Sequence, residues 1–226
     1  MSYLSFGAFA DARRYLDDAL RMHRALGNRE IEGNTNSTLS ELAWREGDAA
    51  LALRHAQAAV DIGREGHNRL YETDALWSLG NAELALGRAA AAIDAFERSR
   101  ALAGEIGAAA QVLNALDGLA RVALMRQYAG EAAEFIDALL AQAGGDPCTP
   151  ETLAGTYEHL IRLTMHRAWA AVGDPRADAL IDGAHALLIA EADRIRDAAL
   201  RESFLTRIAE HQEIVARWQS RRAGLA

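Results

Sequence analysis

The sequence predicts an all-α fold, a solenoid of antiparallel helix pairs stacked on one another. The first observation behind this prediction is a pattern that recurs every 40 residues, in which a glycine is followed five residues later by an alanine. The two columns are Gly7, Gly47 and Gly87, and Ala12, Ala52, Ala92 and Ala132. A period of about 20 to 50 residues is typical of solenoids, and such folds usually bind rather than catalyse. The second observation is composition, because only three prolines stand beside abundant Ala, Leu, Arg and Glu, which favour helices.

Each unit of the regular part, residues 6–143, is expected to hold one helix, a turn at the glycine and a second helix. Leu39, Leu79 and Leu119 belong to the first helices, and Gln127 stands at the fourth position of the glycine column. Glycine just past a helix end can adopt the left-handed conformation that terminates the helix. In the second helix the alanine lets a neighbouring helix approach closely, so we expect a bulky side chain at Ala92 to overpack that contact.

The first unit is incomplete, because residues 1–6 are too few for the helix expected before the first turn. Two explanations are open: a solvent-facing capping helix begins the array, or the chain is the C-terminal piece of a longer protein, which we favour. In the second case Tyr3, Leu4, Phe6 and Phe9 are expected to form an exposed apolar end. Such an end could also mediate a homodimer.

The regularity is interrupted after the third helix pair. Residues 144–149 are expected to form an irregular linker, and residues 150–196 a divergent helix pair. Thr149 can cap a helix, and Pro150 suits the first helical position. The first helix of this pair is expected to end near Gly173.

The best-defined unit resembles the tetratricopeptide repeat. Its matching residues are Leu76-Trp77-Ser78-Leu79-Gly80, then Gly87, Ala92 and Phe96, in the order of the family's L-G, G, A and F columns. Glu83 lies where the family usually has a tyrosine, and the period of 40 exceeds the family's length of about 34. The longer period resembles that of arrays in large bacterial signalling proteins. The resemblance implies a right-handed superhelix with a C-terminal capping helix.

Residues 197–222 are similar to the segment that closes tetratricopeptide domains at the C-terminus of bacterial multidomain regulators. These include class III adenylate cyclases with an ATPase module and related transcriptional activators. The matching residues are Leu200-Arg201, Ser203-Phe204-Leu205, Glu210-His211, Ile214 and Trp218. Ala209 replaces the usual proline, so the segment could form one continuous helix or two. This second resemblance implies a signalling or regulatory parent protein with upstream domains.

The family resemblance also implies that the first helix of each pair lines a concave groove that binds a protein or peptide. The family's ligand-facing positions correspond to Asn34, Ser37, Glu41, Trp44 and Arg45, to Asp74, Trp77, Asn81 and Leu84, and to Asn114, Asp117, Arg121, Leu124 and Met125. Asparagine both donates and accepts hydrogen bonds, so Asn34, Asn81 and Asn114 could hold an extended peptide backbone. Trp44 and Trp77 could anchor its side chains. The alternative is that the polar residues are solvated and the tryptophans pack between repeats.

Charge and cysteine content limit the remaining functions. The 32 acidic and 24 basic residues give a net charge of −8, which disfavours nonspecific binding of nucleic acid by the body of the domain. Cys148 is the only cysteine, so no intrachain disulfide forms and a reducing compartment is expected. Neither a secretory leader nor a long apolar run is evident, so we expect a cytoplasmic protein without a membrane segment.

Motifs for catalysis, cofactor binding or metal binding are not evident: there is no HExxH and no phosphate-binding loop. We therefore expect a noncatalytic interaction or sensor scaffold. The alternative is an enzyme or effector-processing protein whose site lies near Cys148, His159 and His166, with the cysteine as nucleophile and a histidine as base. Ordinary surface or partly buried histidines explain the same residues without a site.

Overall fold

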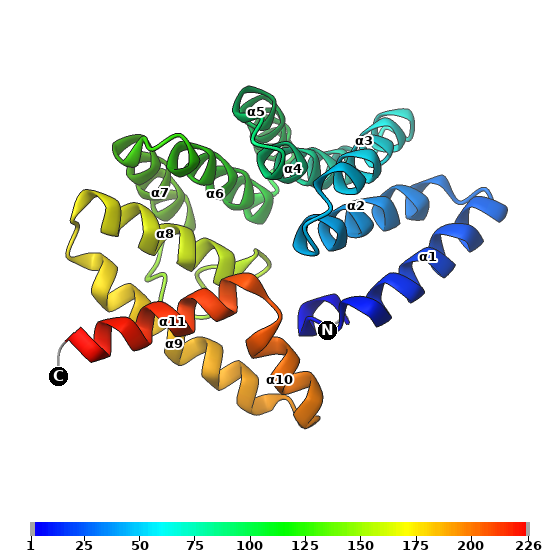
Figure 1. The fold of residues 1–226 in the computed structure, drawn as a ribbon. Helices are drawn as coiled ribbons and strands as arrows, with labels where there is room; N and C mark the ends of the chain where they lie inside the picture. The colour runs from blue at the N-terminus through cyan, green and yellow to red at the C-terminus, as the bar shows by residue number, and fades with distance from the viewer. Residues whose placement is uncertain (1–2, 225–226) are drawn as a thin grey trace.

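The computed structural model describes residues 3–224, which are helical over most of their length (Figure 1). A short 3₁₀-helix, η1 (Leu4–Phe6), precedes the α-helices. These are α1 (Phe9–Ala25), α2 (Arg29–Arg45), α3 (Ala49–Glu65), α4 (Arg69–Ala85), α5 (Ala89–Ile106), α6 (Ala109–Met125), α7 (Ala129–Ala143), α8 (Glu158–Val172), α9 (Arg176–Arg194), α10 (Ala198–Thr206) and α11 (Ala209–Gly224). The all-α prediction is confirmed, since residues 3–224 contain no strand. Over the same range, none of the helices has the length and hydrophobicity needed to cross a bilayer.

The turn within each unit lies where the glycine column predicts it. Gly47 and Gly87 separate α2 from α3 and α4 from α5, with φ angles of 86° and 71°. Gly7 has the same left-handed conformation before α1, with φ of 70°. Gln127 occupies the fourth turn with φ of 63°, a conformation in which a residue with a Cβ atom is strained. The turn geometry is therefore conserved along the array even where glycine is absent.

Phe96 of α5 fills the contact between two first helices. Its side chain is fully buried, and so is Ala92 one turn earlier on the same helix. A Cβ atom added at Gly80 of α4 or at Gly118 of α6 would lie 2.5 Å from the Phe96 ring. Both glycines therefore allow α4 and α6 to close over the ring.

The helices form an inner and an outer layer. Helices α2, α4, α6 and α8 contact one another in that order, whereas α3, α5 and α7 lie outside and pack between them. The stack curves because successive inner helices approach more closely than successive outer ones (Figure 1). The inner helices consequently line a concave face, and α2, α4 and α6 carry the predicted groove positions.

Helix α8 begins later than the sequence indicates. Residues 150–155 form turns, and α8 starts at Glu158 rather than at Pro150. The Thr149 hydroxyl donates a hydrogen bond to the Asp146 carbonyl oxygen at 3.0 Å instead of capping a helix. Tyr157, the residue before α8, instead contacts Glu41, Trp77 and Asn114 of the inner helices.

The closing segment forms two helices, α10 and α11, although it lacks the proline expected to separate them. The Nδ1–H group of His211 donates a hydrogen bond to the carbonyl oxygen of Phe204, with 2.8 Å between the two heavy atoms. That carbonyl lies in the last turn of α10, where no later helical N–H is in place to reach it. A side chain of α11 thus satisfies the end of α10 and stabilises the break.

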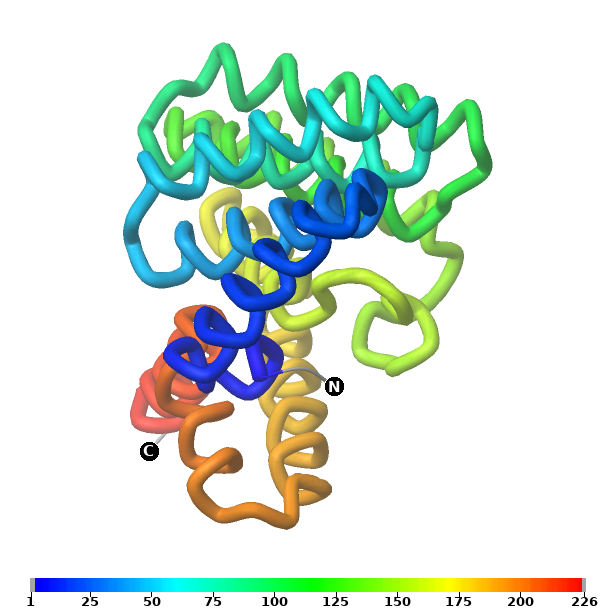
Figure 2. Tube along the Cα trace, turned by 90° about the vertical axis from the view of Figure 1, so that its right-hand side faces the viewer, coloured from blue at the N-terminus to red at the C-terminus, as the bar shows by residue number. Residues whose placement is uncertain are grey.

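The apolar N-terminal end is largely covered, contrary to the expectation from the sequence. Leu4 is buried, and Phe6 and Phe9 pack against the cluster formed by the C-terminal helices. Gly7 lies so close to α10 that an added Cβ atom would be 3.0 Å from the carbonyl oxygen of Ser203. Figures 1 and 2 both show the N-terminal segment beside α10 and α11. The closing segment therefore meets the first residues of the array, and the solenoid closes on itself.

Candidate binding sites on the concave face

Six of the predicted groove residues meet in one polar hollow of about 300 Å³. They lie on α2, α4 and α6 and are Asn34, Ser37, Glu41, Asp74, Trp77 and Asn114. The irregular segment before α8 also lines this hollow, through Thr156 and Tyr157. The structure thus brings residues of three repeats into one hollow, and it adds a wall that the repeat register could not supply.

Tyr157 lies against Trp77, one of the two tryptophans expected to anchor a peptide's side chains. Its ring stacks on Trp77, with ring centroids 4.1 Å apart and planes inclined by 14°. Its hydroxyl donates to Glu41 Oε2 at 2.9 Å, and its backbone N–H donates to Asn114 Oδ1 at 3.2 Å. Burial is the main cause of the raised pKa of Tyr157, so this hydroxyl stays protonated and keeps donating. Sequence reasoning missed Tyr157 because it comes from the irregular segment, outside the repeat register.

The three asparagines lie in different environments. Asn34 is exposed, whereas Asn81 is buried and its Nδ2 donates to the Trp77 carbonyl oxygen of its own helix at 2.8 Å. Asn114 is also buried and accepts the hydrogen bond from Tyr157. The structure therefore leaves Asn34 as the solvent-facing amide of the three.

The charged groove residues pair within the chain. Arg45 donates to Glu41 at 2.9 Å and to Glu210 of α11 at 2.8 Å, and its guanidinium lies 4.8 Å from the ring centre of Trp44. Burial opposes the charge of Arg45, but Glu210 and Glu41 outweigh it and raise its pKa. Asp117 and Arg121 form a second pair at 2.8 Å on α6. The Arg45–Glu210 pair links the concave face to the closing segment.

An apolar cleft of about 520 Å³ lies further along the concave face. Trp44, Leu84, Leu124 and Met125 from the ends of α2, α4 and α6 line one wall, and Leu160 and Leu163 of α8 line another. We call this the apolar cleft. Arg121 and Arg167 also line it, as do Glu210 and Glu213 of α11. Met125, at its edge, is 40% exposed.

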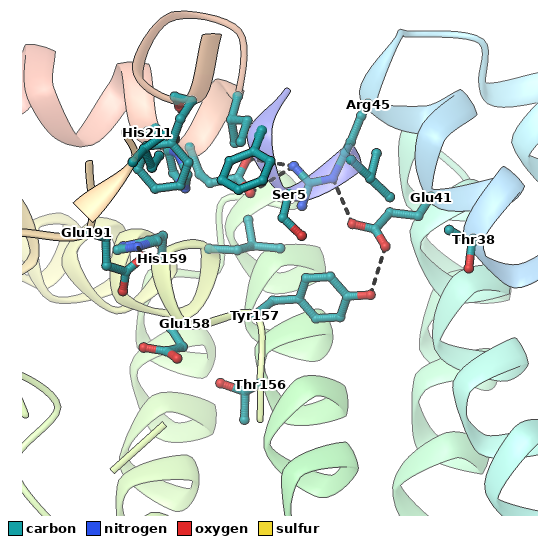
Figure 3. Close-up of a pocket in the computed structure, with 17 residues that line it drawn as sticks. Ser5, Thr38, Glu41, Arg45, Thr156, Tyr157, Glu158, His159, Glu191 and His211 are labelled. Carbon is teal, nitrogen blue, oxygen red and sulfur yellow. Dashed lines mark hydrogen bonds and ion pairs between the residues drawn. The ribbon is translucent and has the colours of Figure 1, made fainter. Parts of the chain in front are cut away.

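A third hollow, the central cavity, lies where the concave face meets the chain's own ends (Figure 3). Its volume is about 470 Å³, and its wall comes from η1, α2, the start of α8, the end of α9, and α10 and α11. Four carboxylates and two imidazoles line it, those of Glu41, Glu158, Glu191, Glu210, His159 and His211. His159 Nε2 donates to Glu191 Oε2 at 3.0 Å, which lowers the pKa of that carboxyl.

The residues of the alternative catalytic site have separate surroundings. His159 lines the central cavity, whereas His166 lines a different hollow and donates from Nδ1 to the Ala177 carbonyl oxygen at 3.1 Å. Cys148 packs over Gly183 of α9, and burial followed by the nearby Asp146 raises the pKa of its thiol. Within residues 3–224, no three His, Cys, Asp or Glu side chains are grouped so as to hold a metal ion.

Known structures share the fold of this chain. It is similar to a putative kinesin light chain with nearly identical TPR-like repeats from Podosopora anserina, with 17% identity, 85% of this chain and 90% of that chain covered, and a TM-score of 0.53. It is also similar to BtubC (BKLC) from P. vanneervenii, with 16% identity, 96% and 90% of the two chains covered, and a TM-score of 0.59. No family model and no curated protein sequence matches the chain. The chain therefore has the fold of a tetratricopeptide-like helical-repeat solenoid.

Proposed function

We propose that this chain is a noncatalytic interaction scaffold that binds a segment of a protein partner, or a peptide, in the apolar cleft. The observation that carries the proposal is the cleft itself, a hollow of about 520 Å³ with Trp44, Leu84 and Met125 on its wall. Large apolar and aromatic side chains around a concave site are what a peptide's anchoring side chain needs. The tetratricopeptide-like fold supports the same general role.

The main contact with the partner is assigned to the apolar cleft, because Tyr157 already occupies the polar hollow. Trp77, Glu41 and Asn114 are engaged by Tyr157, whereas the cleft is open at Met125. In the polar hollow, the exposed amide of Asn34 can pair with a peptide backbone. Of the residues that the repeat register assigns to the groove, Trp44, Arg121 and Met125 would then make the strongest contacts.

A paired substitution tests this proposal. Peptides selected from a random display library on the unaltered protein would be titrated against Met125→Glu and against the control Met22→Glu, whose methionine is exposed on α1. A carboxylate at the cleft must be desolvated against apolar walls. We expect at least about tenfold weaker binding for Met125→Glu, a loss of roughly 1.4 kcal/mol, and no change for Met22→Glu. If every selected peptide binds both variants equally, the cleft is not the site.

We also propose that the chain is a module of a longer signalling or regulatory protein. The likeness of residues 197–222 to the closing segment of bacterial multidomain regulators supports a sensor or scaffold module that acts on upstream domains in the cytoplasm. The lone cysteine, Cys148, fits a reducing compartment. An ATPase, cyclase or DNA-binding domain encoded in frame before Met1 is the expected finding, and a stop codon immediately upstream contradicts it.

A further inference from the structure

We propose that the central cavity is a second binding site, which takes a small organic cation: a protonated amine that carries an apolar group. This site is separate from the apolar cleft and goes beyond the proposed scaffold function. It is built mainly by the irregular parts of the chain, since η1, the start of α8 and helices α9 to α11 surround it and α2 alone comes from the regular repeats. Closure of the solenoid therefore creates it.

The charges around the central cavity favour a cation. Four carboxylates line it, whereas Arg45 is the one guanidinium on its wall. Arg45 is already bonded to two of the four, Glu41 and Glu210. Glu158 pairs at 3.1 Å with Arg162, which lies behind the wall, so four carboxyl groups stand against two guanidinium groups, an excess of two acidic groups. An anion placed here would be repelled, and a cation attracted.

His211 supplies a hydrogen-bond acceptor that lacks a partner. The residue is 4% exposed and lines the cavity, and its Nδ1 must carry a proton because the Phe204 carbonyl oxygen can only accept. In the neutral ring Nε2 is then an acceptor, and no group within residues 3–224 donates to it. Burial, with a smaller effect of His159, lowers the pKa of His211 to about 4, so the ring is neutral at pH 7.

The polar wall therefore presents acceptors more than donors. The Glu41 carboxylate comes from α2, and Glu191 of α9 and His211 of α11 lie across the space from it (Figure 3). An ammonium group carries three N–H donors and one positive charge, so it can donate to acceptors of this kind and is attracted by the carboxylates.

The apolar residues that line the central cavity indicate that the amine carries an apolar group. Leu4, Phe6, Leu160, Ile195, Phe204 and Ile208 supply an apolar surface beside the acidic one. A volume of about 470 Å³ falls within the range of small-molecule sites, roughly 300–1,000 Å³. The ligand class is thus an amine with an alkyl or aryl group rather than a bare inorganic cation.

Isosteric probes test the charge requirement directly. Phenethylamine, the neutral phenethyl alcohol and the anionic phenylacetate would be titrated into the full chain by calorimetry at pH 7. We expect saturable one-to-one binding of the amine, at least about tenfold tighter than binding of the alcohol or the acid, a difference of roughly 1.4 kcal/mol. Absence of amine binding, or equal affinity for amine and alcohol, overturns the proposal, because the cavity would then be closed or merely apolar.

Substitutions locate the bound amine. Glu191→Gln keeps the shape and the acceptor for His159 but removes a charge, so amine affinity should fall at least about tenfold. The matched control is Glu97→Gln on α5, whose carboxylate is exposed and paired with Arg100. Met125→Glu should leave amine binding unchanged, which separates this site from the apolar cleft. Unchanged affinity in folded Glu191→Gln contradicts the proposal, and the selectivity among the three probes decides the matter if that variant does not fold.

Discussion

The ring of Phe96 shows how single residues set the spacing of this solenoid. It is enclosed by two helices that lack a side chain where they touch it, at Gly80 and Gly118. Gln127 shows the reverse case, in which surrounding structure holds a residue with a side chain in a turn that suits glycine. Packing therefore requires glycine at the first two positions, whereas at the third the surrounding structure holds the left-handed turn without glycine.

Substitution of Gly118 tests this close approach. A methyl group there would lie 2.5 Å from the Phe96 ring, so Gly118→Ala should lower the free energy of unfolding by roughly 1–3 kcal/mol. The matched control is Gly130→Ala on α7, where an added Cβ meets no atom within 4 Å. There the loss of unfolded-state freedom should stabilise by about 0.4–1 kcal/mol. Urea denaturation measures both, and stabilisation of both variants would show that α6 does not close on Phe96.

His211 makes stability depend on pH in a definite direction. Its pKa is about 4 in the folded chain against 6.5 ordinarily, so below pH 6.5 the unfolded chain binds a proton that the folded chain does not. Stability should therefore fall as the pH drops from 6.5 toward 4, by roughly 3 kcal/mol from this group.

The variant His211→Asn isolates that contribution. The asparagine amide can still donate to the Phe204 carbonyl oxygen, but it does not titrate. Unfolding free energies measured between pH 7 and pH 4 should fall less steeply for this variant than for the unaltered chain. Parallel pH profiles would mean that the His211 ring is not buried in the neutral form.

At the scale of elements, the sequence predicts the helices that belong to the repeat. It does not predict the helix boundaries that depend on contacts with distant parts of the chain. Helices α2 to α7 follow from the 40-residue columns, because the same positions face the same neighbours in each unit. The start of α8 does not follow from Thr149 and Pro150, since Tyr157 binds to three helices of the concave face. The break before α11 depends on His211, a residue whose partner lies outside its own helix.

The candidate sites divide in the same way. The repeat register places Trp44, Arg121 and Met125 on one concave face, and the apolar cleft contains all three. The central cavity depends on residues from five separate parts of the chain, and no periodic pattern relates them. Its acidic and apolar halves meet only after the solenoid has closed, so sequence spacing could not reveal them.

At the scale of the whole molecule, closure distinguishes this solenoid from an open array. The N-terminal segment packs on α10 and α11, and α11 returns to the concave face through Glu210 (Figures 1 and 2). This contact between the two ends of the chain covers most of the apolar residues expected to be exposed at the N-terminal end. It also forms the central cavity, which both ends line. Both proposed sites have a wall formed by α11, so both depend on the docking of this helix.

The most direct test of closure is a double-mutant cycle between Arg45 and Glu210, which lie 165 residues apart and pair at 2.8 Å. Unfolding free energies would be measured for the unaltered chain, Arg45→Met, Glu210→Gln and the double variant. Both side chains are nearly buried, so Arg45→Met leaves the Glu210 carboxylate without its partner, and Glu210→Gln leaves Arg45 with Glu41 alone. A docked α11 therefore predicts a coupling free energy of roughly 2 kcal/mol. Additive effects, with a coupling below about 0.5 kcal/mol, would contradict a closed solenoid.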